Sequence, residues 1–360
     1  MKYMDEFRNR KLADGLLAKI RDISHQETQI MEVCGTHTMA IFKYGIRSLM
    51  PEPIKLLSGP GCPVCVTHNR DIDTAIALAQ RKEMILITFG DMFRVPGSNS
   101  SFAKVKAEGG DIRVVYSVLD ALQIARENPT KQVVFFAVGF ETTSPTVAVS
   151  ILKAREEGIN NFFILSSHKL IPQAMESLLD SGEVQIDGFL CPGHVSTIIG
   201  SHPYQSIVQN YRKPAVVTGF EPLDILQAIW MILHQIHRDE PRVAIQYSRV
   251  VDERGNPVAL SILDQVFEKK DASWRGMGII PQSGLKLRKE FEEFDAEIVF
   301  PVEIEESREN PECLCGEVLR GVKIPTDCKL FRKVCNPDHP VGACMVSVEG
   351  TCLNYFQYQQ

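Results

Sequence analysis

Short apolar runs alternate with segments of helical periodicity through most of the 360-residue chain, and this alternation constrains the fold more than any other feature. The first four runs are QIMEV, IKLLS, MILIT and DIRVVYS, and the next four are VVFFAVGF, FFILSS, GFLCPG and AVVTGF. Apolar runs of about four to eight residues with helices between them are typical of parallel strands buried on both faces. We therefore predict an α/β fold with two successive Rossmann-like units, each with four strands in a parallel sheet.

The regular alternation ends near residue 242, and about 150 residues per domain suggests two or three domains for a chain of this length. We expect a first α/β domain at 1–130, a second α/β domain at 131–241 and a C-terminal domain at 242–360. The last of these begins with the β-like stretch VAIQYSRVV and the glycine-rich GMGIIPQSG. Its tail is rich in cysteine, so we expect a metal centre to hold this module together in part.

Charge and hydropathy exclude several classes of protein. The formal net charge is −6, which gives no global electrostatic reason to expect a nucleic-acid partner. Apolar runs such as VVFFAVGF reach about a third of a membrane span, and the charged N-terminal segment lacks the apolar core of a signal peptide. We therefore expect a soluble, cytoplasmic protein without a membrane partner. The sequence also lacks a phosphate-binding loop and a serine-hydrolase elbow, and no dinucleotide-binding turn opens the first or fifth helix.

Three cysteines near the N-terminus follow strand runs. Cys34 follows the first run in MEVCGTHT, and Cys62 and Cys65 follow the second in LLSGPGCPVCVTHN. Neighbouring parallel strands lie about 5 Å apart, so the three thiols are expected to converge at one sheet edge. A Cys-x-x-Cys near a helix start is expected to have a lowered thiol pKa, which suits metal ligation or dithiol exchange. The alternative is a pair of buried, inert cysteines, and the isolated Cys191 is expected to be a core residue.

The tail spaces its six cysteines as C-x-C-x12-C-x6-C-x8-C-x7-C. In the reducing cytosol clustered thiols are more often metal ligands or redox groups than disulfides. Structural zinc sites usually use C-x2-C pairs, and none occurs here. Irregular spacing of single cysteines favours an iron–sulfur cluster, which needs four thiolates, over zinc or disulfides. Two thiols remain, and they are candidates for a dithiol near the cluster.

Polar groups that follow later strand runs are further candidates, because ligands of open α/β sheets bind beyond the carboxyl ends of strands. The block PGHVSTIIG at 192–200 offers His194 and Ser196, although a lone histidine here is more often a helix-start or packing residue. Glu141 and Glu221 each follow Gly-Phe, and we consider them as paired acids in an interdomain cleft. For each glutamate alone, a favourable position at a helix N-terminus is the simpler explanation.

Distinctive blocks along nearly the whole chain resemble the HypD family of maturation factors, which help to assemble the iron centre of [NiFe]-hydrogenases. These blocks are CGTHT, GPGCPVC, FGDMFRVPG, GFETT, PGHVSTIIG, GFEPLDIL and the tail CGEVL…CKLF…CNP…GACMVSVEGTC. The chain departs from some relatives at 34–38, where it has Gly-Thr-His in place of Gly-Gly-His after the cysteine. This departure leaves the role of Thr36 open but does not affect Cys34.

The resemblance implies two α/β units and a C-terminal part with a [4Fe–4S] cluster. It also implies a complex with HypC that holds one iron atom while the Fe(CN)2CO moiety is built, with HypE as the cyanide donor. Cys34 would be the iron-binding thiolate, together with a cysteine of HypC. Cys62 and Cys65 would be the accompanying redox pair or further iron ligands. His37 would hydrogen-bond a cyanide nitrogen or carry a proton, and a helix-capping role is the alternative.

The family's likeness to ferredoxin:thioredoxin reductase implies electron transfer from the cluster to a dithiol, with one member of the Cys-x-C pair as a ligand and its neighbour in a disulfide. We predict that four tail thiols bind the cluster: Cys313, Cys328, Cys335 and Cys352. Cys315 and Cys344 would then be the adjacent redox pair. Residues two apart on an extended chain point to opposite faces, which separates Cys313 from Cys315. Exchange of Cys313 with Cys315, or of Cys344 with Cys352, remains an alternative.

These predictions favour an assembly scaffold with redox activity over a conventional turnover enzyme. Soft thiolates suit iron with cyanide and carbonyl ligands, and a dithiol beside it exchanges two electrons. The first alternative is a stand-alone thiol–disulfide oxidoreductase of the ferredoxin:thioredoxin reductase type. The second is a zinc-stabilised interaction protein without a redox role.

Overall fold

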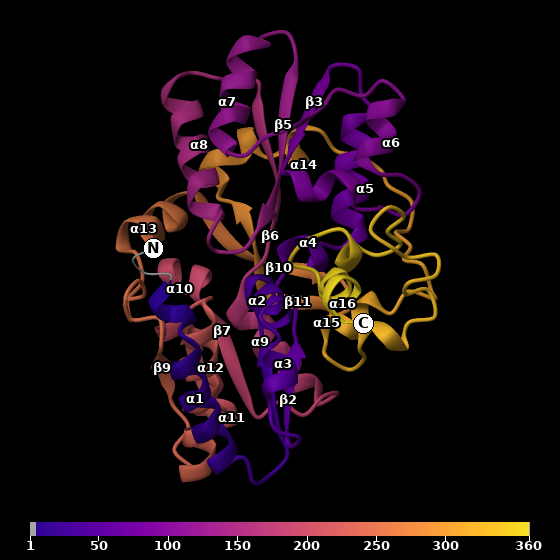
Figure 1. Ribbon diagram of the computed structural model, residues 1–360. Coiled ribbons are helices and arrows are strands. Elements are labelled where there is room, and N and C mark those ends of the chain that lie inside the picture. Colours follow the sequence, from indigo (N-terminus) through magenta and orange to yellow (C-terminus); the bar gives the residue numbers. More distant parts are fainter. Residues whose placement is uncertain (1–4, 360) are drawn as a thin grey trace.

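The computed structural model describes residues 5–359, and two parallel sheets form the framework of this part of the chain (Figure 1). The first sheet has the order β2-β1-β7-β8-β9, and the second has the order β4-β3-β5-β6. The strands of the first sheet are β1 (Thr28–Glu32), β2 (Ile54–Ser58), β7 (Gly188–Pro192), β8 (Ala215–Thr218) and β9 (Val243–Ile245). The strands of the second sheet are β3 (Met84–Thr88), β4 (Ile112–Val114), β5 (Gln132–Gly139) and β6 (Phe162–His168). In both orders the direction of winding reverses beside the first strand, as in doubly wound α/β folds.

The predicted α/β class and all eight predicted strands are confirmed, but the two sheets are not successive units of four strands. The chain begins the first sheet with β1 and β2, builds the whole second sheet, and then returns to the first sheet with β7, β8 and β9. Met31 of β1 thus lies opposite Phe189 of β7. Most strand pairs join chain neighbours, and the β1–β7 pair is the long crossover that closes the first sheet around the second. The domain boundaries at 130 and 241 stay predictions.

Helices connect the parallel strands and cover the sheets (Figure 1). The longer helices are α1 (Arg10–Ile23), α2 (Gly35–Lys43), α5 (Asn69–Ala79), α7 (Val118–Glu127), α8 (Ser144–Glu156), α9 (Ile171–Ser181), α12 (Pro222–Arg238), α13 (Pro257–Val266) and α16 (Thr351–Tyr358). Shorter helices are α3 (Ile46–Leu49), α4 (Pro63–Val66), α6 (Phe102–Ala107), α10 (Gly193–Ile199), α11 (Gln205–Tyr211), α14 (Ala296–Val299) and α15 (Cys315–Leu319). The 3₁₀ helices are η1 (Asp5–Arg8), η2 (Gly90–Arg94), η3 (His202–Tyr204), η4 (Lys289–Phe294), η5 (Pro325–Asp327) and η6 (Ala343–Met345).

The apolar runs of the central strands are buried on both faces of the sheets, as their sequences predict, whereas the edge strands β2 and β4 each expose a residue. In β3, Ile85 and Ile87 pack into the cluster that contains residues of α7 and α8. Met84 and Leu86 point to the opposite face and join the cluster that contains residues of α5 and α6. Successive side chains of a strand alternate between faces, so a run such as MILIT must be apolar throughout when helices cover both sides.

An antiparallel hairpin and a loop-rich tail follow the two sheets. The hairpin consists of β10 (Phe267–Trp274) and β11 (Gly278–Leu287), and its turn uses Gly276 and Gly278 at φ +73°. The glycine-rich stretch noted in the sequence is therefore a turn and the start of a strand. The expected β-like run VAIQYSRVV forms only the short edge strand β9. In the tail, η6 lies against α4 and α16 lies against α2.

Candidate functional site

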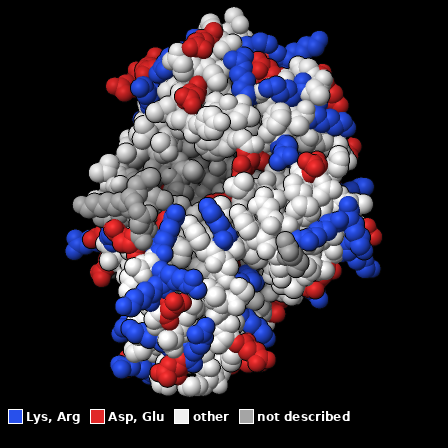
Figure 2. All heavy atoms as spheres, in the orientation of Figure 1, with Lys and Arg blue, Asp and Glu red and all other residues white. Residues whose placement is uncertain are grey.

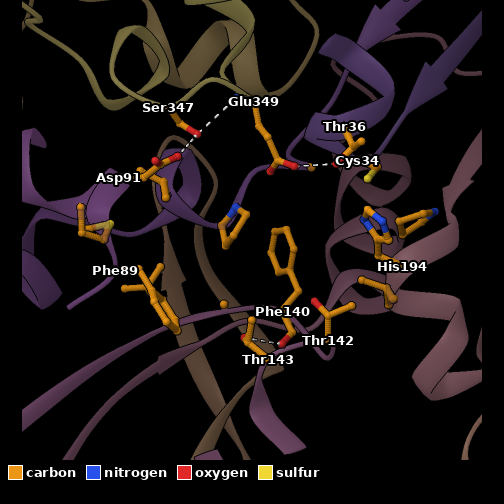
Figure 3. A pocket seen from close by; sticks show the side chains of 18 of the residues that line it. Cys34, Thr36, Phe89, Asp91, Phe140, Thr142, Thr143, His194, Ser347 and Glu349 are labelled. Atoms are coloured by element: carbon orange, nitrogen blue, oxygen red, sulfur yellow. Dashed lines mark hydrogen bonds between the residues drawn. The ribbon is translucent and has the colours of Figure 1, made fainter. Parts of the chain in front are cut away.

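The carboxyl ends of both sheets face one cavity of about 430 Å³ (Figure 3). Cys34 and His194 reach it from the turns after β1 and β7, the two strands on either side of the winding reversal in the first sheet. Asp91 and Phe140 reach it from the turns after β3 and β5, which flank the corresponding reversal in the second sheet. Ligands of doubly wound folds bind at such points, so this cavity is the leading candidate site.

Cys34 lies where β1 ends and α2 begins, and its side chain is only 7% exposed. The turn that follows β2 packs directly against Cys34, because β1 and β2 are paired with Glu32 opposite Ser58. Gly35 N donates to Gly61 O at 2.8 Å, and a Cβ at Gly61 would lie 2.1 Å from the Cys34 nitrogen. The GPG sequence is therefore needed for close approach. Burial raises the pKa of Cys34 to about 12, and the charge of Glu349 adds to this rise.

Glu349, from the distant tail, closes the cavity above Cys34 (Figure 3). Thr36 Oγ1 donates to Glu349 Oε1 at 2.6 Å, and Ser347 Oγ donates to Asp91 Oδ2 at 2.9 Å. Burial raises the pKa of Glu349. Sequence analysis did not single out Glu349 or Asp91, although both lie in blocks that carry the family resemblance.

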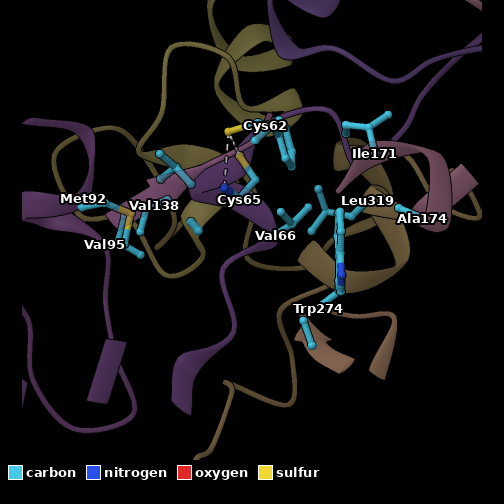
Figure 4. Close-up of a cluster of buried hydrophobic side chains, with 14 of the residues drawn as sticks. Cys62, Cys65, Val66, Met92, Val95, Val138, Ile171, Ala174, Trp274 and Leu319 are labelled. Carbon is cyan, nitrogen blue, oxygen red and sulfur yellow. Dashed lines mark hydrogen bonds between the residues drawn. The ribbon is translucent and has the colours of Figure 1, made fainter. Parts of the chain in front are cut away.

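Cys62 and Cys65 form a close pair in the buried core and do not line this cavity (Figure 4). Their Sγ atoms are 2.7 Å apart, and Cys65 N donates to Cys62 Sγ at 3.3 Å. The expected lowering of the thiol pKa is wrong for Cys65, whose pKa is raised well above the ordinary value by burial and by its sulfur neighbours. The reason is that α4 is a single helical turn in a dry environment, where its dipole does not offset the loss of solvation.

The six tail cysteines line one small, apolar cavity. Within it the Sγ atoms of Cys315 and Cys344 are 2.9 Å apart. Cys344 also contacts the sulfur atoms of Cys352 and Cys65, so it joins the tail thiols to the Cys62–Cys65 pair. Cys313, Cys328 and Cys352 are half-buried, whereas Cys335 is buried. Across residues 5–359, no group of three or more His, Cys, Asp or Glu side chains is arranged around a single-ion site.

The three front thiols are neighbours along one sheet edge but have different environments. Cys34 opens into the cavity, whereas Cys62 and Cys65 face the protein interior and are absent from its lining. Simultaneous ligation of one iron by all three stays a prediction. Cys191 is fully buried in the first sheet, as expected for a core residue.

Of the two candidate histidines, His194 lines the cavity and His37 does not. His37 is fully buried, and its Nε2 lies 3.1 Å from Thr218 O and 3.0 Å from Gly219 O. Burial lowers the pKa of His37 to about 4. The cavity is lined instead by His194, whose ring stacks on Phe220 at 4.0 Å. Direct action of His37 on a bound ligand stays a prediction, and His194 is better placed for it.

Three other polar candidates do not line the Cys34 cavity. Ser196 Oγ donates to Pro192 O at 2.8 Å at the start of α10. Glu221 pairs with Arg8 at the start of α12. Glu141 Oε1 accepts from the N–H group of Ile171 at 3.0 Å, so the two glutamates do not form the paired acids considered from the sequence.

Comparison with known proteins identifies the family. The family model described as "HypD: Hydrogenase formation hypA family" matches residues 11–359. The hydrogenase maturation factor HypD2 of Bradyrhizobium diazoefficiens is 47% identical to this chain, over 99% of the chain and 97% of that protein. The chain belongs to the HypD family. The HypD proteins of Rhizobium leguminosarum and Cupriavidus necator are 47% and 45% identical, over 99% of this chain and 96% and 97% of theirs.

Family membership confirms the resemblance found in the sequence and makes the chain a HypD hydrogenase maturation factor. Within residues 5–359, no helix of this HypD protein is both long and apolar enough to span a membrane. On the face shown in Figure 2, lysine and arginine side chains are interspersed with aspartate and glutamate.

Proposed function

We propose that this HypD protein holds one iron ion at Cys34 while cyanide and carbon monoxide ligands are attached to it, and that its other thiols supply electrons for this assembly. The observation that carries the proposal is a continuous line of sulfur contacts beside the Cys34 cavity. The line runs from Cys62 through Cys65 and Cys344 to Cys315. Packing alone does not require four thiols in successive contact, whereas electron transfer by disulfide exchange does.

The iron substrate fits the electrostatics of the Cys34 cavity. Soft thiolates suit low-spin iron with cyanide and carbonyl ligands. A thiol with a pKa near 12 must release its proton when a metal binds, and the neighbouring charge of Glu349 opposes a free thiolate. A cation between the two groups removes that repulsion, so the cavity favours the metal-bound state of Cys34 over a bare thiolate.

The tail thiols fit an iron–sulfur centre by their chemistry. A [4Fe–4S] cluster takes four thiolates, and the tail cavity is lined by six cysteine side chains. We assign the cluster to Cys313, Cys328, Cys335 and Cys352, which leaves the Cys315–Cys344 pair beside it. When bound, such a cluster supplies electrons one at a time.

The dithiol pairs exchange two electrons through balanced steps. With Cys315–Cys344 oxidised, the Cys65 thiolate attacks Cys344 Sγ, and Cys315 leaves as a thiolate. The Cys62 thiolate then attacks Cys65 Sγ, which forms the Cys62–Cys65 disulfide and releases Cys344. The net reaction transfers the disulfide from Cys315–Cys344 to Cys62–Cys65, nearer the Cys34 cavity. The reverse reaction transfers two electrons from Cys315 and Cys344 to Cys62 and Cys65.

The charge of Arg275 favours the thiolate that Cys315 becomes when the Cys315–Cys344 disulfide opens, although the pKa of the thiol is raised overall. The hydrogen bond with Cys344 and burial raise its pKa, and the charge of Arg275 acts against this rise. A leaving thiol with a lower pKa departs faster. Arg275 is 4% exposed, so solvent screens its charge weakly.

The mouth of the Cys34 cavity fits a protein partner. Tyr116 lines the cavity, yet it is 97% exposed. Exposed aromatic side chains are enriched at protein interfaces. In the proposal HypC docks here and adds a cysteine ligand to the iron, and HypE donates the cyanide.

An infrared spectrum of the purified complex with HypC tests the iron site. We expect cyanide and carbonyl stretching bands in the wild-type complex and their loss in Cys34→Ala, with the fold unchanged by circular dichroism. Cys191→Ala is the matched control, because Cys191 is a buried cysteine outside the cavity. Unchanged bands in Cys34→Ala would remove Cys34 from the mechanism.

Iron counting with serine variants tests the tail assignment. We expect loss of cluster iron in Cys328→Ser and Cys335→Ser, and retention in Cys315→Ser and Cys344→Ser. The Cys62→Ser and Cys65→Ser variants should keep the visible absorption of the cluster but fail to attach ligands to iron. Loss of iron in Cys315→Ser but not in Cys313→Ser would reverse the assignment of that pair.

A stand-alone thiol–disulfide oxidoreductase is the second candidate function, because the line of sulfur contacts also serves that activity. It leaves the cavity around Cys34 without a role. Copurification of iron with the HypC complex separates the two functions: iron bound through Cys34 supports the scaffold, and iron confined to the tail supports the oxidoreductase.

A further inference from the structure

A separate pocket of about 410 Å³ lies beside the tail thiols, and Cys313 and Cys315 form part of its lining. The loop at 96–98, the segment at 308–311 and the turn at 340–342 contribute the rest of the wall, together with Asn69 and Arg275. Small-molecule sites are typically about 300–1,000 Å³ in volume, so the pocket has room for a small ligand. The electron transfer proposed above does not use this pocket.

The pocket reaches one residue of the Cys315–Cys344 pair but not the other. Cys315 lines the pocket, whereas Cys344 does not line it and is fully buried. Gly342 leaves this part of the wall open, because a Cβ there would lie 2.8 Å from Cys313 Sγ and 3.6 Å from Cys315 Sγ. Which sulfur of a disulfide is attacked depends on access. The pocket therefore gives access to Cys315, whereas Cys344 contacts Cys65 in the interior.

The charges that line the pocket favour an anion. They are Arg275, Arg308 and Glu309. Arg275 pairs with Glu309 at 3.2 Å, whereas Arg308 is exposed and is in no ion pair within the described part of the chain. Asp73 lies outside the lining, where it accepts from Ser98 Oγ at 2.6 Å. The lining therefore carries one unpaired positive charge in addition to the Arg275–Glu309 pair.

Polar groups of the same wall hold the backbone of Arg308. Asn69 Nδ2 donates to Arg308 O at 2.6 Å, and the Arg308 N–H group donates to Ser98 Oγ at 2.8 Å. Asn69 and Ser98 both line the pocket. Arg308 is thus anchored at the pocket wall, and its guanidinium group suits a carboxylate.

We propose that this pocket admits a small anionic thiol of the mercaptocarboxylate class, which reduces the Cys315–Cys344 disulfide from outside while its carboxylate lies toward Arg308. The inference rests on the proposed role of Cys315 and Cys344 as a redox pair. Cys315 is only 3% exposed, which favours a small thiol over one on the surface of a protein. The reduced pair would then pass its electrons to Cys62 and Cys65.

The reduction proceeds in two balanced steps. The thiolate of the ligand attacks Cys315 Sγ, the bond between Cys315 and Cys344 breaks, and Cys344 leaves as a thiolate. A second molecule of the thiol attacks the ligand sulfur of this mixed disulfide, which releases Cys315 as a thiolate and the ligand as its own disulfide. Two ligand molecules are oxidised, the pair gains two electrons, and the two cysteines take up the protons that the ligands lose.

Reaction of the full-length protein with three small thiols tests this entry site. The protein is first treated with diamide, and peptide mass spectrometry checks that Cys315 and Cys344 have formed a disulfide. Mercaptopropionate, mercaptoethanol and cysteamine are similar in size but end in a carboxylate, a hydroxyl and an ammonium group. The rate at which each thiol opens the disulfide is divided by its rate with a small reference disulfide, because thiols differ in pKa and nucleophilicity.

We expect this rate ratio to be at least about threefold higher for mercaptopropionate than for mercaptoethanol, and lowest for cysteamine. The preference should shrink at high salt, which screens the charge of the exposed Arg308. Acid quenching followed by alkylation should find the thiol on Cys315 and the alkyl group on Cys344. A thiol bound to Cys344, or equal ratios for the three thiols, would overturn the proposal.

Two variants of Arg308 test the origin of the preference. Arg308→Ala should lose the preference for mercaptopropionate, and Arg308→Lys should keep it. Arg238→Ala, at an exposed position of α12 outside the pocket lining, is the matched control and should react as the wild type does. An unchanged preference in Arg308→Ala would refute the proposal.

The first step of the experiment separates this inference from the proposed function. If diamide forms no disulfide between Cys315 and Cys344, the redox pair of the proposed function is refuted together with this inference. If the disulfide forms but opens without a preference for the anionic thiol, only the entry site is refuted.

Discussion

Replacing Glu32 with glutamine is expected to make the protein more stable at mildly alkaline pH and to leave its stability nearly unchanged at acidic pH. Glu32 lies in β1 and is fully buried. Ser58 Oγ donates to its Oε1 at 2.6 Å, but Oε2 has no hydrogen-bond partner, and Arg47 approaches no closer than 3.8 Å. Burial outweighs these favourable contacts and raises the pKa of Glu32 to about 7.

The direction of the effect follows from the proton balance. The folded pKa is above the ordinary value of 4.5, so the folded state binds more protons between these values. The stabilising contribution of Glu32 is therefore fully present below pH 4.5 and is lost as the pH rises through about 7. Between about pH 5 and about pH 8, the shifted pKa lowers the free energy of unfolding of the wild type by about 2.5 kcal/mol. The glutamine variant does not titrate at this position and avoids that loss.

Urea unfolding of the metal-free chain at both pH values measures this difference. Buried histidines such as His37 and His168 have lowered pKa values, and their contributions change in the opposite direction. Subtracting the wild-type stability from that of the variant at each pH removes them. Glu240→Gln, at an exposed position, is the control and should show no pH-dependent difference. Parallel pH profiles for wild type and Glu32→Gln would refute the reasoning, as would a variant less stable at the higher pH.

Three further substitutions test close packing, helix propensity and a buried charge. Gly61→Ala places a Cβ 2.1 Å from the Cys34 nitrogen and should destabilise the fold by about 1–3 kcal/mol in urea unfolding. Gly15→Ala, in α1 with open space around it, should instead stabilise the fold by about 0.5–1 kcal/mol. Arg249→Ala removes the ion-pair partner of fully buried Asp224, bonded at 2.8 Å, but leaves the hydrogen bond from Gln246 Nε2, so it should cost about 1.5–3 kcal/mol. No loss of stability in Arg249→Ala would show that the remaining donors and solvent compensate the Asp224 charge.

Local sequence was sufficient to locate the strands but not to order them. A run such as MILIT is apolar at every position because both faces are buried, and this property is visible without knowledge of its neighbours. The pairing of β1 with β7 depends on contacts across more than 150 residues, for which the strand sequences give no specific signal. The hairpin was missed because glycine and proline at 276–284 obscure its alternation.

The candidate site, too, could be predicted where it depends on strand order but not where it depends on how the tail folds back. The position of Cys34 at a strand end, next to the turn that holds Cys62, follows from strand order alone. The contact of Cys65 with Cys344 and the position of Glu349 above Cys34 depend on how the tail folds back, which spacing does not reveal. The raised pKa of Cys65 has the same origin, because it reflects burial by segments remote in sequence.

The interrupted first sheet also sets the order in which the protein can fold during synthesis. β1 and β2 leave the ribosome early, but their neighbour β7 begins only at Gly188. At about 5–20 residues per second, the buried face of β1 waits on the order of ten seconds for its partner. All strands of the second sheet lie between Met84 and His168, so that sheet can be completed during the wait. We therefore expect nascent chains stalled before residue 188 to hold a folded second sheet and an exposed apolar β1, which is the form that a chaperone would bind.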